Sequence, residues 1–182
     1  MTYGRYFEEF EPGATYQHWP GKTVTEYDHH HFCLLTMIRH PLHTDHHFAR
    51  TFTRHGRPLV VSPLIFALLT GLSEADIAGA ALAHRGFANF EHSAPLFHGD
   101  TLYARTTILA VRPVDGHPAR GAVHARTEGV NQHGELIAAY DRQLEVPRGR
   151  HPLAPPRGRH TRWPFTGDDI RRPVTDPPPE TG

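Results

Sequence analysis

Histidine is the chemically versatile residue type that stands out in this sequence. The chain of 182 residues contains 17 histidines, among them the clusters His29-His30-His31 and His46-His47. Imidazole rings bind zinc and exchange protons near neutral pH, so such clusters raise the question of a metal site. However, the histidines are scattered along the chain, and the first cluster lacks an i, i+4 pair on one helix face with a matching distant ligand. We therefore expect no metal site, and a zinc protein is the alternative that metal analysis would test.

The single cysteine is a second candidate for chemistry. Cys33 lies in the apolar run Phe32–Leu35. One cysteine cannot form an intramolecular disulfide, which fits a reducing compartment, and an apolar neighbourhood is typical of a buried thiol. We expect Cys33 to be buried rather than catalytic.

The start of the most apolar predicted helix is a third candidate. Ser62-Pro63 precedes the apolar run Leu64–Leu69. Serine is a favoured N-cap and proline suits the first helical position, so this pair predicts where the helix begins. The helix is apolar on nearly all sides, and Gly71 predicts a close approach of another backbone. A sheet wrapped around this helix would bury it, and the free N–H groups at its start would carry partial positive charge.

The other predicted elements surround this helix in the sequence. A helix from Glu26 to about Met37 is predicted with Thr25 as its cap, and a short helix from Asp45 to Arg50. Three β runs separated by turn signals predict an antiparallel meander. The runs are Leu102–Val111, Gly121–Val130 and Leu136–Val146, with turns at Asp115–Pro118 and Asn131–Gly134.

Length and composition predict one folded domain and a tail. The hydrophobic content of 38% is enough for a core, and residues 1–147 carry the predicted elements. From Arg148 the sequence is rich in Pro, Arg and Gly, which support neither a helix nor a sheet interior. We predict that residues 148–182 form an irregular or partly disordered C-terminal tail.

Charge and the N-terminal sequence limit the partners and the location. Lys plus Arg equals Asp plus Glu at 19 each, so the net charge favours neither nucleic acid nor an anionic membrane as a partner. The first ten residues contain acids and no apolar stretch of signal-peptide length, and no run approaches the roughly 18 apolar residues of a membrane span. We expect a cytoplasmic protein.

Four segments of the sequence stand out together: GRYFEEFEPG (4–13), LLTMIRHPLHTD (34–45), GRPLVVS (56–62) and FHGDTL (97–102). They resemble the MaoC-like (R)-specific enoyl-CoA hydratases and dehydratases, in particular an itaconyl- or mesaconyl-CoA hydratase-like branch. Their order and spacing match the family over most of residues 4–147.

The resemblance implies a fold and a ligand class. Members have the hot-dog fold, an α+β architecture in which a curved antiparallel sheet wraps around a long central helix. They usually pair into dimers and bind the pantetheine arm of an acyl thioester. The resemblance thus implies a homodimer that takes an acyl-CoA or acyl-carrier-protein thioester, with no cofactor beyond the CoA or phosphopantetheine of the substrate.

The resemblance also implies a catalytic segment, from which this chain departs. The family pattern is Asp, two residues, Pro, one residue, His, and the two side chains form an acid/base pair around a water. His43 matches the histidine, whereas Ile38 occupies the Asp position and His40 stands where Asn is usual. His43 with His40, or His43 with Asp45, is the replacement pair that we consider. Ile38 and Pro41 are expected to line the substrate pocket.

The thioester oxygen is expected to bind at the start of the central helix. N–H groups of Val61 and Ser62 are the candidates for an oxyanion hole, and Ser62 is also expected to cap the helix. Asp100 is expected to be a structural turn residue. Three arginines near the implied tunnel mouth, Arg39, Arg54 and Arg57, are candidates for contacts with CoA phosphates or an acidic carrier protein, or for an ordinary solvated surface.

Several functions remain open at this point. The first is hydration or dehydration of an enoyl or 3-hydroxyacyl thioester, with His43 as general acid/base. The second, which the loss of the Asp would suit, is addition of an amine or another nucleophile to an unsaturated thioester in natural-product biosynthesis. A thioesterase using Asp28 or Asp45 is the third, and a catalytically inactive acyl-binding hot-dog protein is the non-enzyme alternative.

Overall fold

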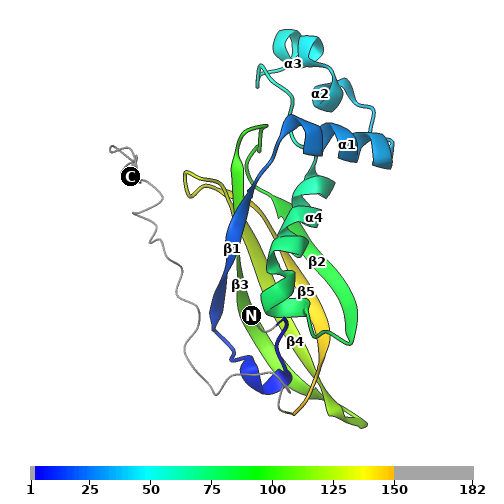
Figure 1. Ribbon diagram of the computed structural model, residues 1–182, viewed down its shortest axis with the longest axis vertical. Helices are drawn as coiled ribbons and strands as arrows, with labels where there is room; N and C mark the ends of the chain where they lie inside the picture. Colours follow the sequence, from blue (N-terminus) through cyan, green and yellow to red (C-terminus); the bar gives the residue numbers. More distant parts are fainter. Residues whose placement is uncertain (1–2, 150–182) are drawn as a thin grey trace, which may run out of the picture.

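The computed structural model describes residues 3–149, which form a curved antiparallel sheet around one long helix, α4 (Ser62–Ser73) (Figure 1). The sheet order within the described residues is β1-β3-β4-β5-β2, with every neighbouring pair antiparallel. The strands are β1 (Thr15–Thr23), β2 (Ala83–His92), β3 (Thr101–Val114), β4 (His117–Val130) and β5 (Leu136–Pro147). This arrangement confirms the fold that the resemblance implies. The predicted tail lies outside the described residues, apart from Arg148 and Gly149.

The meander β3-β4-β5 confirms the three predicted strands and extends them. Both predicted turns are present, and Gly116 and Gly134 adopt positive φ angles of 74° and 77° there. In β4 the side chains alternate between buried and half-buried along most of the strand, because one face packs on the core and the other meets water. The flanking strands β1 and β2 were not predicted from the sequence. Pro and Gly interrupt β1, and β2 has register shifts at two points, so neither shows a clean alternation.

Helix α4 is buried against the sheet through Leu64, Ile65 and Leu69. Two sequence-based expectations about it are wrong. Val61, not Ser62, is the N-cap residue, and Ser62 and Pro63 occupy the first helical positions. Among the described residues no atom lies within 4 Å of where a Cβ of Gly71 would be, so no backbone makes the predicted close approach.

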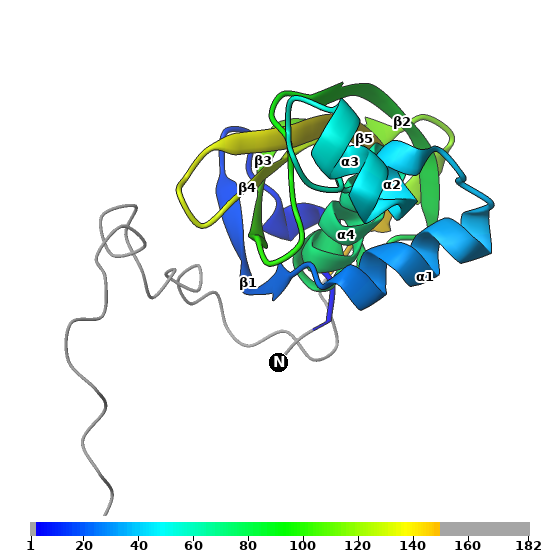
Figure 2. The same cartoon turned by 90° about the horizontal axis from the view of Figure 1, so that it is seen from above.

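Three short helices cover the N-terminal end of α4 (Figures 1 and 2). They are α1 (Glu26–Thr36), α2 (Pro41–Thr44) and α3 (His46–Phe52), and a 3₁₀ turn, η1 (Phe7–Glu9), lies at the opposite end of the sheet. The predicted cap of α1 is confirmed, since Thr25 Oγ1 accepts a hydrogen bond from the Asp28 N–H at 3.1 Å. Asp45 Oδ1 caps α3 by accepting from the Phe48 N–H at 2.9 Å. We call α1, α2 and α3 the cap helices.

Helix α1 is attached to the body by His29 and Cys33, its two buried residues. They are four positions apart and therefore share one helix face. Cys33 packs in the cluster that contains α4, which confirms its predicted burial. His29 is fully buried, and its burial, followed by the neighbouring imidazoles of His98 and His43, lowers its pKa to about 4.

Within residues 3–149, no helix has the length and apolar character needed to cross a membrane.

The buried His29 predicts a loss of stability in mild acid. Its pKa is about 4 in the folded protein and near 6.5 in the unfolded chain, so between these values the unfolded state binds more protons. Stability is therefore full above pH 6.5 and falls as the pH drops toward 4, with His29 contributing on the order of 3 kcal/mol. Urea unfolding at pH 7, 6, 5 and 4.5 measures this slope.

His29→Gln keeps one hydrogen-bond acceptor and one donor but has no titrating ring. The slope of the free energy of unfolding against pH should therefore be smaller in this variant, by as much as about 1.4 kcal/mol per pH unit. His117→Gln, at the exposed start of β4, is the matched control and should leave the slope unchanged. An unaltered slope in His29→Gln would contradict this assignment.

Candidate functional site

His43 lies half-buried on α2 with a fixed tautomer. Its Nδ1 is 2.6 Å from the Leu59 carbonyl oxygen, which can only accept a hydrogen bond. Nδ1 therefore carries the proton, and Nε2 is left with its lone pair. The segment before α4 is held in turn, because the Leu59 N–H donates to the Leu42 carbonyl. The backbone thus presents His43 Nε2 as a base.

A second imidazole, His29, lies beside His43, with ring centroids 6.0 Å apart. The Val61 N–H donates to His29 Nε2 at 3.2 Å, so the proton of the neutral ring is on Nδ1. Nδ1 lies 2.7 Å from His98 Nε2 and donates to it. Both nitrogens of His29 are therefore committed, and its low pKa keeps it uncharged at neutral pH.

The chain of hydrogen bonds ends near two exposed side chains, Glu26 and His46. His46 Nε2 is 2.9 Å from Glu26 Oε1, and ligand atoms of Glu26, His46 and His98 lie within 4.8 Å of one another. Two imidazoles and a carboxylate at this spacing match three ligands of a divalent cation such as zinc. At His98 a metal would compete with the ring proton or with the bond from His29. The absence of a metal site stays a prediction.

The two backbone amides predicted to be oxyanion donors, at the N-terminus of α4, differ in the hydrogen bonds that they make. The Val61 N–H already donates to His29. The Ser62 N–H is at the first helical position, where an amide has no acceptor within the helix, and Pro63 carries no N–H at all. The Ser62 side chain does not cap α4; its Oγ is 2.7 Å from Nδ1 of His92, whose pKa is lowered by burial.

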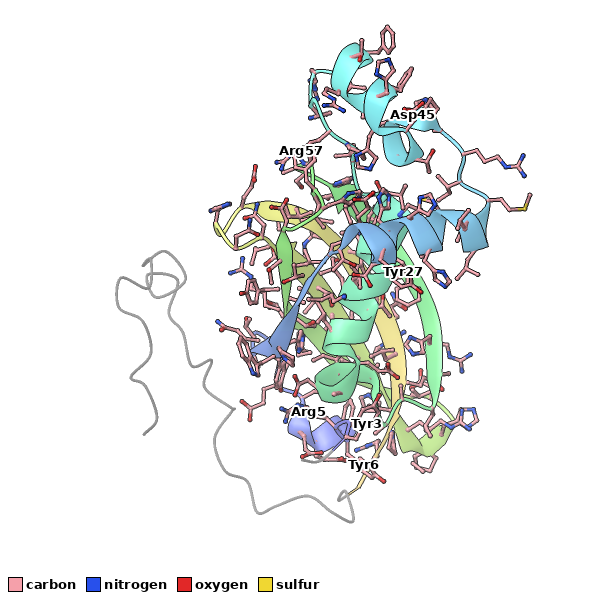
Figure 3. All side chains as sticks on the ribbon, turned by 45° about the horizontal axis from the view of Figure 1, so that its top comes forward. Tyr3, Arg5, Tyr6, Tyr27, Asp45 and Arg57 are labelled. Carbon is pink, nitrogen blue, oxygen red and sulfur yellow. The ribbon has the colours of Figure 1, made fainter. Side chains whose placement is uncertain are left out.

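The two replacement partners proposed for His43 have structural roles of their own. His40 is the N-cap of α2, and its Nδ1 accepts from the Leu42 N–H at 3.1 Å, while its ring centroid is 6.0 Å from that of His43. Asp45 caps α3 among the cap helices (Figure 3), and within residues 3–149 no hydrogen bond or ion pair joins it to His43. The catalytic roles of His40 and Asp45 stay predictions.

The remaining predicted residues fall into three environments. Ile38 packs against the hydrophobic cluster that contains α4, and Pro41 is the first residue of α2, the short helix that also carries His43. Their part in a substrate pocket stays a prediction. Asp100 accepts from the Phe97 N–H and from Gln132 Nε2, as a structural turn residue does.

Two charged residues suggested by the sequence, Arg57 and Asp28, contact neighbouring side chains. The guanidinium of Arg57 lies 3.7 Å from the centroid of the Phe97 ring, at the end of the molecule that holds the cap helices (Figure 3). Asp28 is held by Lys22 and Thr25, whose hydrogen bonds lower its pKa to about 2. Asp28 is therefore an ionised capping residue, which does not support its suggested role as the carboxylate of a thioesterase.

Sequence reasoning considered His29 only as part of a histidine cluster that could bind metal, and it did not single out His92 and His98. For His29 a signal existed, since its i, i+4 spacing to Cys33 marks a shared buried face of α1. His92 and His98 lie outside helices, where spacing carries no such information about partners.

Comparisons with known proteins give the family. The family model for the MaoC like domain matches residues 8–130. The chain is 34% identical over 152 residues to mesaconyl-CoA hydratase from Cereibacter sphaeroides and 33% identical over 153 residues to β-methylmalyl-CoA dehydratase from Chloroflexus aurantiacus. Each alignment covers 84% of this chain but only 43% and 42% of the relatives, so the chain spans less than half of their length.

Solved structures show the same fold. A protein described as a monoamine oxidase regulatory protein from Archaeoglobus fulgius superposes with a TM-score of 0.70 at 27% identity, covering 81% of this chain and 97% of that one. A double hot-dog protein from Mycobacterium tuberculosis has a TM-score of 0.67 at 22% identity, covering 84% of this chain and 46% of that one. This chain belongs to the MaoC-like domain family and has the hot-dog fold.

Proposed function

We propose that this chain adds water to an enoyl thioester, or removes it from a 3-hydroxyacyl thioester. The observation that carries the proposal is the geometry of His43, whose Nδ1–H is held by the Leu59 carbonyl so that Nε2 is available as a base. The relatives named for hydration and dehydration of CoA thioesters support it. CoA or a carrier protein would present the acyl group through the same pantetheine arm.

The proposed reaction needs one base and one oxyanion donor. His43 Nε2 takes a proton from water as the oxygen forms a bond to the β-carbon of the enoyl group. The electron pair of the double bond moves toward the thioester, whose oxygen becomes an enolate stabilised by the Ser62 N–H at the positive end of α4. Protonation of the α-carbon by the resulting imidazolium restores neutral His43. Dehydration is the reverse sequence.

The neutral state of His29 supports this role of His43. A charged imidazole 6.0 Å away would oppose protonation of His43 during the reaction. Burial keeps His29 uncharged, so the proton can move onto His43 without that repulsion.

Ile38 favours a second candidate, the addition of an amine. An isoleucine cannot hold a water, whereas a neutral amine arrives with its own lone pair and has less need of a carboxylate. The family role of the Asp is therefore dispensable if the nucleophile is nitrogen.

We further propose that the protein acts as a cytoplasmic homodimer. Light scattering that gives the mass of one chain at micromolar concentration would contradict the dimer.

Mass spectrometry of crotonyl-CoA and longer enoyl thioesters tests the function. The thioesters are incubated with the protein in water alone and then with glycine and other amines. Gain of one water supports hydration, and an amine adduct without hydration supports the second candidate. Loss of the acyl group, or no change, would contradict both.

Replacement of His43 tests its role as acid and base. His43→Ala should lower turnover by about a hundredfold or more, because general acid–base catalysis contributes that much. Circular dichroism confirms the fold of the variant, and His133→Ala, an exposed turn histidine, is the control that should retain activity. A loss below tenfold would place the chemistry on another group.

Removal of metal tests whether the Glu26, His46 and His98 cluster takes part. His98 is hydrogen-bonded to His29, and the proposed chemistry uses only His43 and the Ser62 N–H. Dialysis against EDTA should therefore leave turnover unchanged. A drop in activity that is restored by zinc, with about one equivalent of zinc in the untreated protein, would make this cluster part of the active site.

A further inference from the structure

The hydroxyl of Ser62 and the ring of His92 form a hydrogen-bonded pair at the N-terminal end of α4. Ser62 Oγ is 2.7 Å from His92 Nδ1, and this is the only hydrogen bond of the Ser62 side chain within residues 3–149. The proposed function uses the Ser62 N–H and gives this pair no role. Because the hydroxyl belongs to the residue that supplies the oxyanion N–H, the direction of its own proton matters for the same site.

Two neighbouring segments of backbone place Ser62 opposite His92. Leu59 and Phe97 form an antiparallel bridge, so the segment before α4 runs beside the segment after β2 in the opposite direction. The contact between Ser62 and His92 lies farther along the same two segments. The pair is therefore held by the fold and does not depend on two long side chains meeting on the surface.

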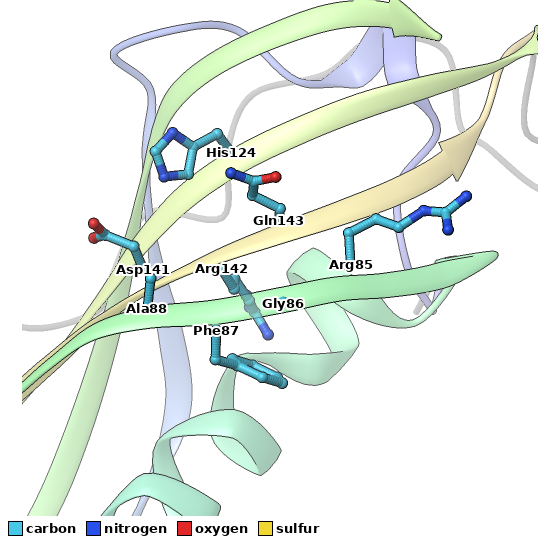
Figure 4. A pocket seen from close by; sticks show the side chains of 8 residues that line it. All are labelled: Arg85, Gly86, Phe87, Ala88, His124, Asp141, Arg142 and Gln143. Carbon is cyan, nitrogen blue, oxygen red and sulfur yellow. The ribbon is translucent and has the colours of Figure 1, made fainter.

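The end of β2 that carries His92 is regular, although the middle of this strand is not. One register shift lies on each side of Phe87, where a cavity of about 190 Å³ opens beside the strand (Figure 4). The lining of this cavity does not include His92. At the end of the strand, Glu91 pairs with Ala139 and His92 pairs with Ala138. Strand β5 therefore fixes the backbone from which the imidazole extends.

The other hydroxyls of α4 show where a serine or threonine in a helix usually donates. Thr70 Oγ1 donates to the Phe66 carbonyl at 2.9 Å, and Ser73 Oγ donates to the Leu69 carbonyl at 2.7 Å, each four residues earlier. Ser62 is the first residue of the helix, so no helical carbonyl lies four residues before it. Its O–H can therefore donate either to its imidazole partner or to a bound ligand.

The surroundings of His92 favour a proton on Nδ1. Burial lowers its pKa, and a hydrogen bond with the Ala94 backbone partly offsets this, so the ring is neutral at pH 7 and carries one proton. Nε2 is buried and has no partner within residues 3–149, so a proton there would be a buried N–H without an acceptor. A backbone group that raises the pKa of an imidazole accepts its proton, which again favours Nδ1. Nδ1–H thus donates to Ser62 Oγ, and the serine O–H points away from the ring.

The Ser62 O–H lies where a second donor is needed and where a ligand can reach it. The Val61 N–H is committed to His29, which leaves the Ser62 N–H as one oxyanion donor at this end of α4. Ser62 is half-buried and Pro63 is exposed, so the start of the helix meets solvent within the described part of the chain. The N–H and O–H belong to one residue, so a single oxygen can accept from both.

We propose that the Ser62 O–H is a second hydrogen-bond donor to the thioester oxygen, and that His92 is the positioning residue that directs it. The inference rests on the proposed function for the place of the thioester. The hydroxyl keeps its proton and donates a hydrogen bond that strengthens as the oxygen becomes an enolate. The Nδ1–H of His92 makes the hydroxyl a better donor by polarising it. Water and amine addition pass through the same enolate, so the role is the same for both nucleophiles.

Kinetics of the two side chains provide the first test. Ser62→Ala removes the hydroxyl but keeps the N–H, and it should lower kcat with crotonyl-CoA by about a hundredfold, as loss of one oxyanion donor does. His92→Leu should lower kcat by a smaller factor. His92→Asn should restore most of the rate, because its amide N–H can donate in place of Nδ1. The matched control is His84→Leu, which removes an exposed histidine of the same strand and should keep the wild-type rate.

The double variant separates positioning from an unrelated structural effect. If His92 acts only through the Ser62 hydroxyl, Ser62→Ala with His92→Leu should lose no more activity than Ser62→Ala alone. Losses that multiply would overturn the positioning role. The double variant also removes both partners of a half-buried pair, so it should fold even if Ser62→Ala alone is destabilised by the unpaired Nδ1–H. Circular dichroism checks the fold of each variant.

Infrared spectroscopy of a bound thioester gives a readout that does not depend on turnover. Butyryl-CoA labelled with ¹³C at the carbonyl has no double bond, so neither water nor an amine can add to it. Its C=O band should lie at lower wavenumber in wild type and His92→Asn than in Ser62→Ala, His92→Leu or the double variant, because hydrogen bonds to the oxygen weaken the C=O bond. This result supports the inference even if no enoyl thioester is converted, in which case only the proposed function fails. The same band position in wild type and in the variants without the hydroxyl would overturn the inference.

Intact-protein mass tests the opposite direction of the hydrogen bond. If the Ser62 O–H donated to Nδ1, His92 would act as a base and Ser62 as a nucleophile. The butyryl group would then move from the sulfur of CoA to Ser62 Oγ, and the serine proton would leave on the CoA thiol. We expect the mass of wild type to be unchanged after incubation with butyryl-CoA. A butyryl adduct that is absent from Ser62→Ala would overturn the proposal.

Discussion

Hydrogen bonds between backbone groups and imidazole rings organise the N-terminal end of α4. The Leu59 carbonyl accepts the Nδ1–H of His43, and the Val61 N–H donates to Nε2 of His29. Each bond selects one tautomer, so the positions of protons and lone pairs are set without a carboxylate. The segment 59–61 that makes these bonds is itself fixed. The Val60 N–H donates to the Leu96 carbonyl, and α4 starts two residues later, at Ser62.

This constraint bears on the segment for which we propose a catalytic role. Ile38, at the position where the resemblance implies an Asp, packs against the core, so this position supplies no carboxylate to orient or charge His43. His43 is oriented by the backbone instead, and its neighbour His29 is kept neutral by burial.

The sequence predicted those features that depend on local patterns of residues. The meander, the apolar helix α4, the Thr25 cap and the burial of Cys33 all follow from apolar periodicity and turn chemistry. The predictions that Ser62 caps α4 and that another backbone approaches Gly71 were wrong. Val61 is the N-cap residue and the Ser62 hydroxyl pairs with His92 instead, and no segment of the described chain approaches Gly71.

Features that depend on contacts between distant segments were not accessible from the sequence. His43 was found only through the resemblance, and the chain from Val61 through His29 to His98 joins residues that are 32 and 69 positions apart. Nitrogen NMR of protein labelled with ¹⁵N-histidine, with signals assigned from His43→Gln and His29→Gln, tests this chain most directly. The account predicts that both rings carry the proton on Nδ1 at pH 7.5, with His43 Nε2 unprotonated. A proton on Nε2 of His43 at this pH would contradict its role as the base.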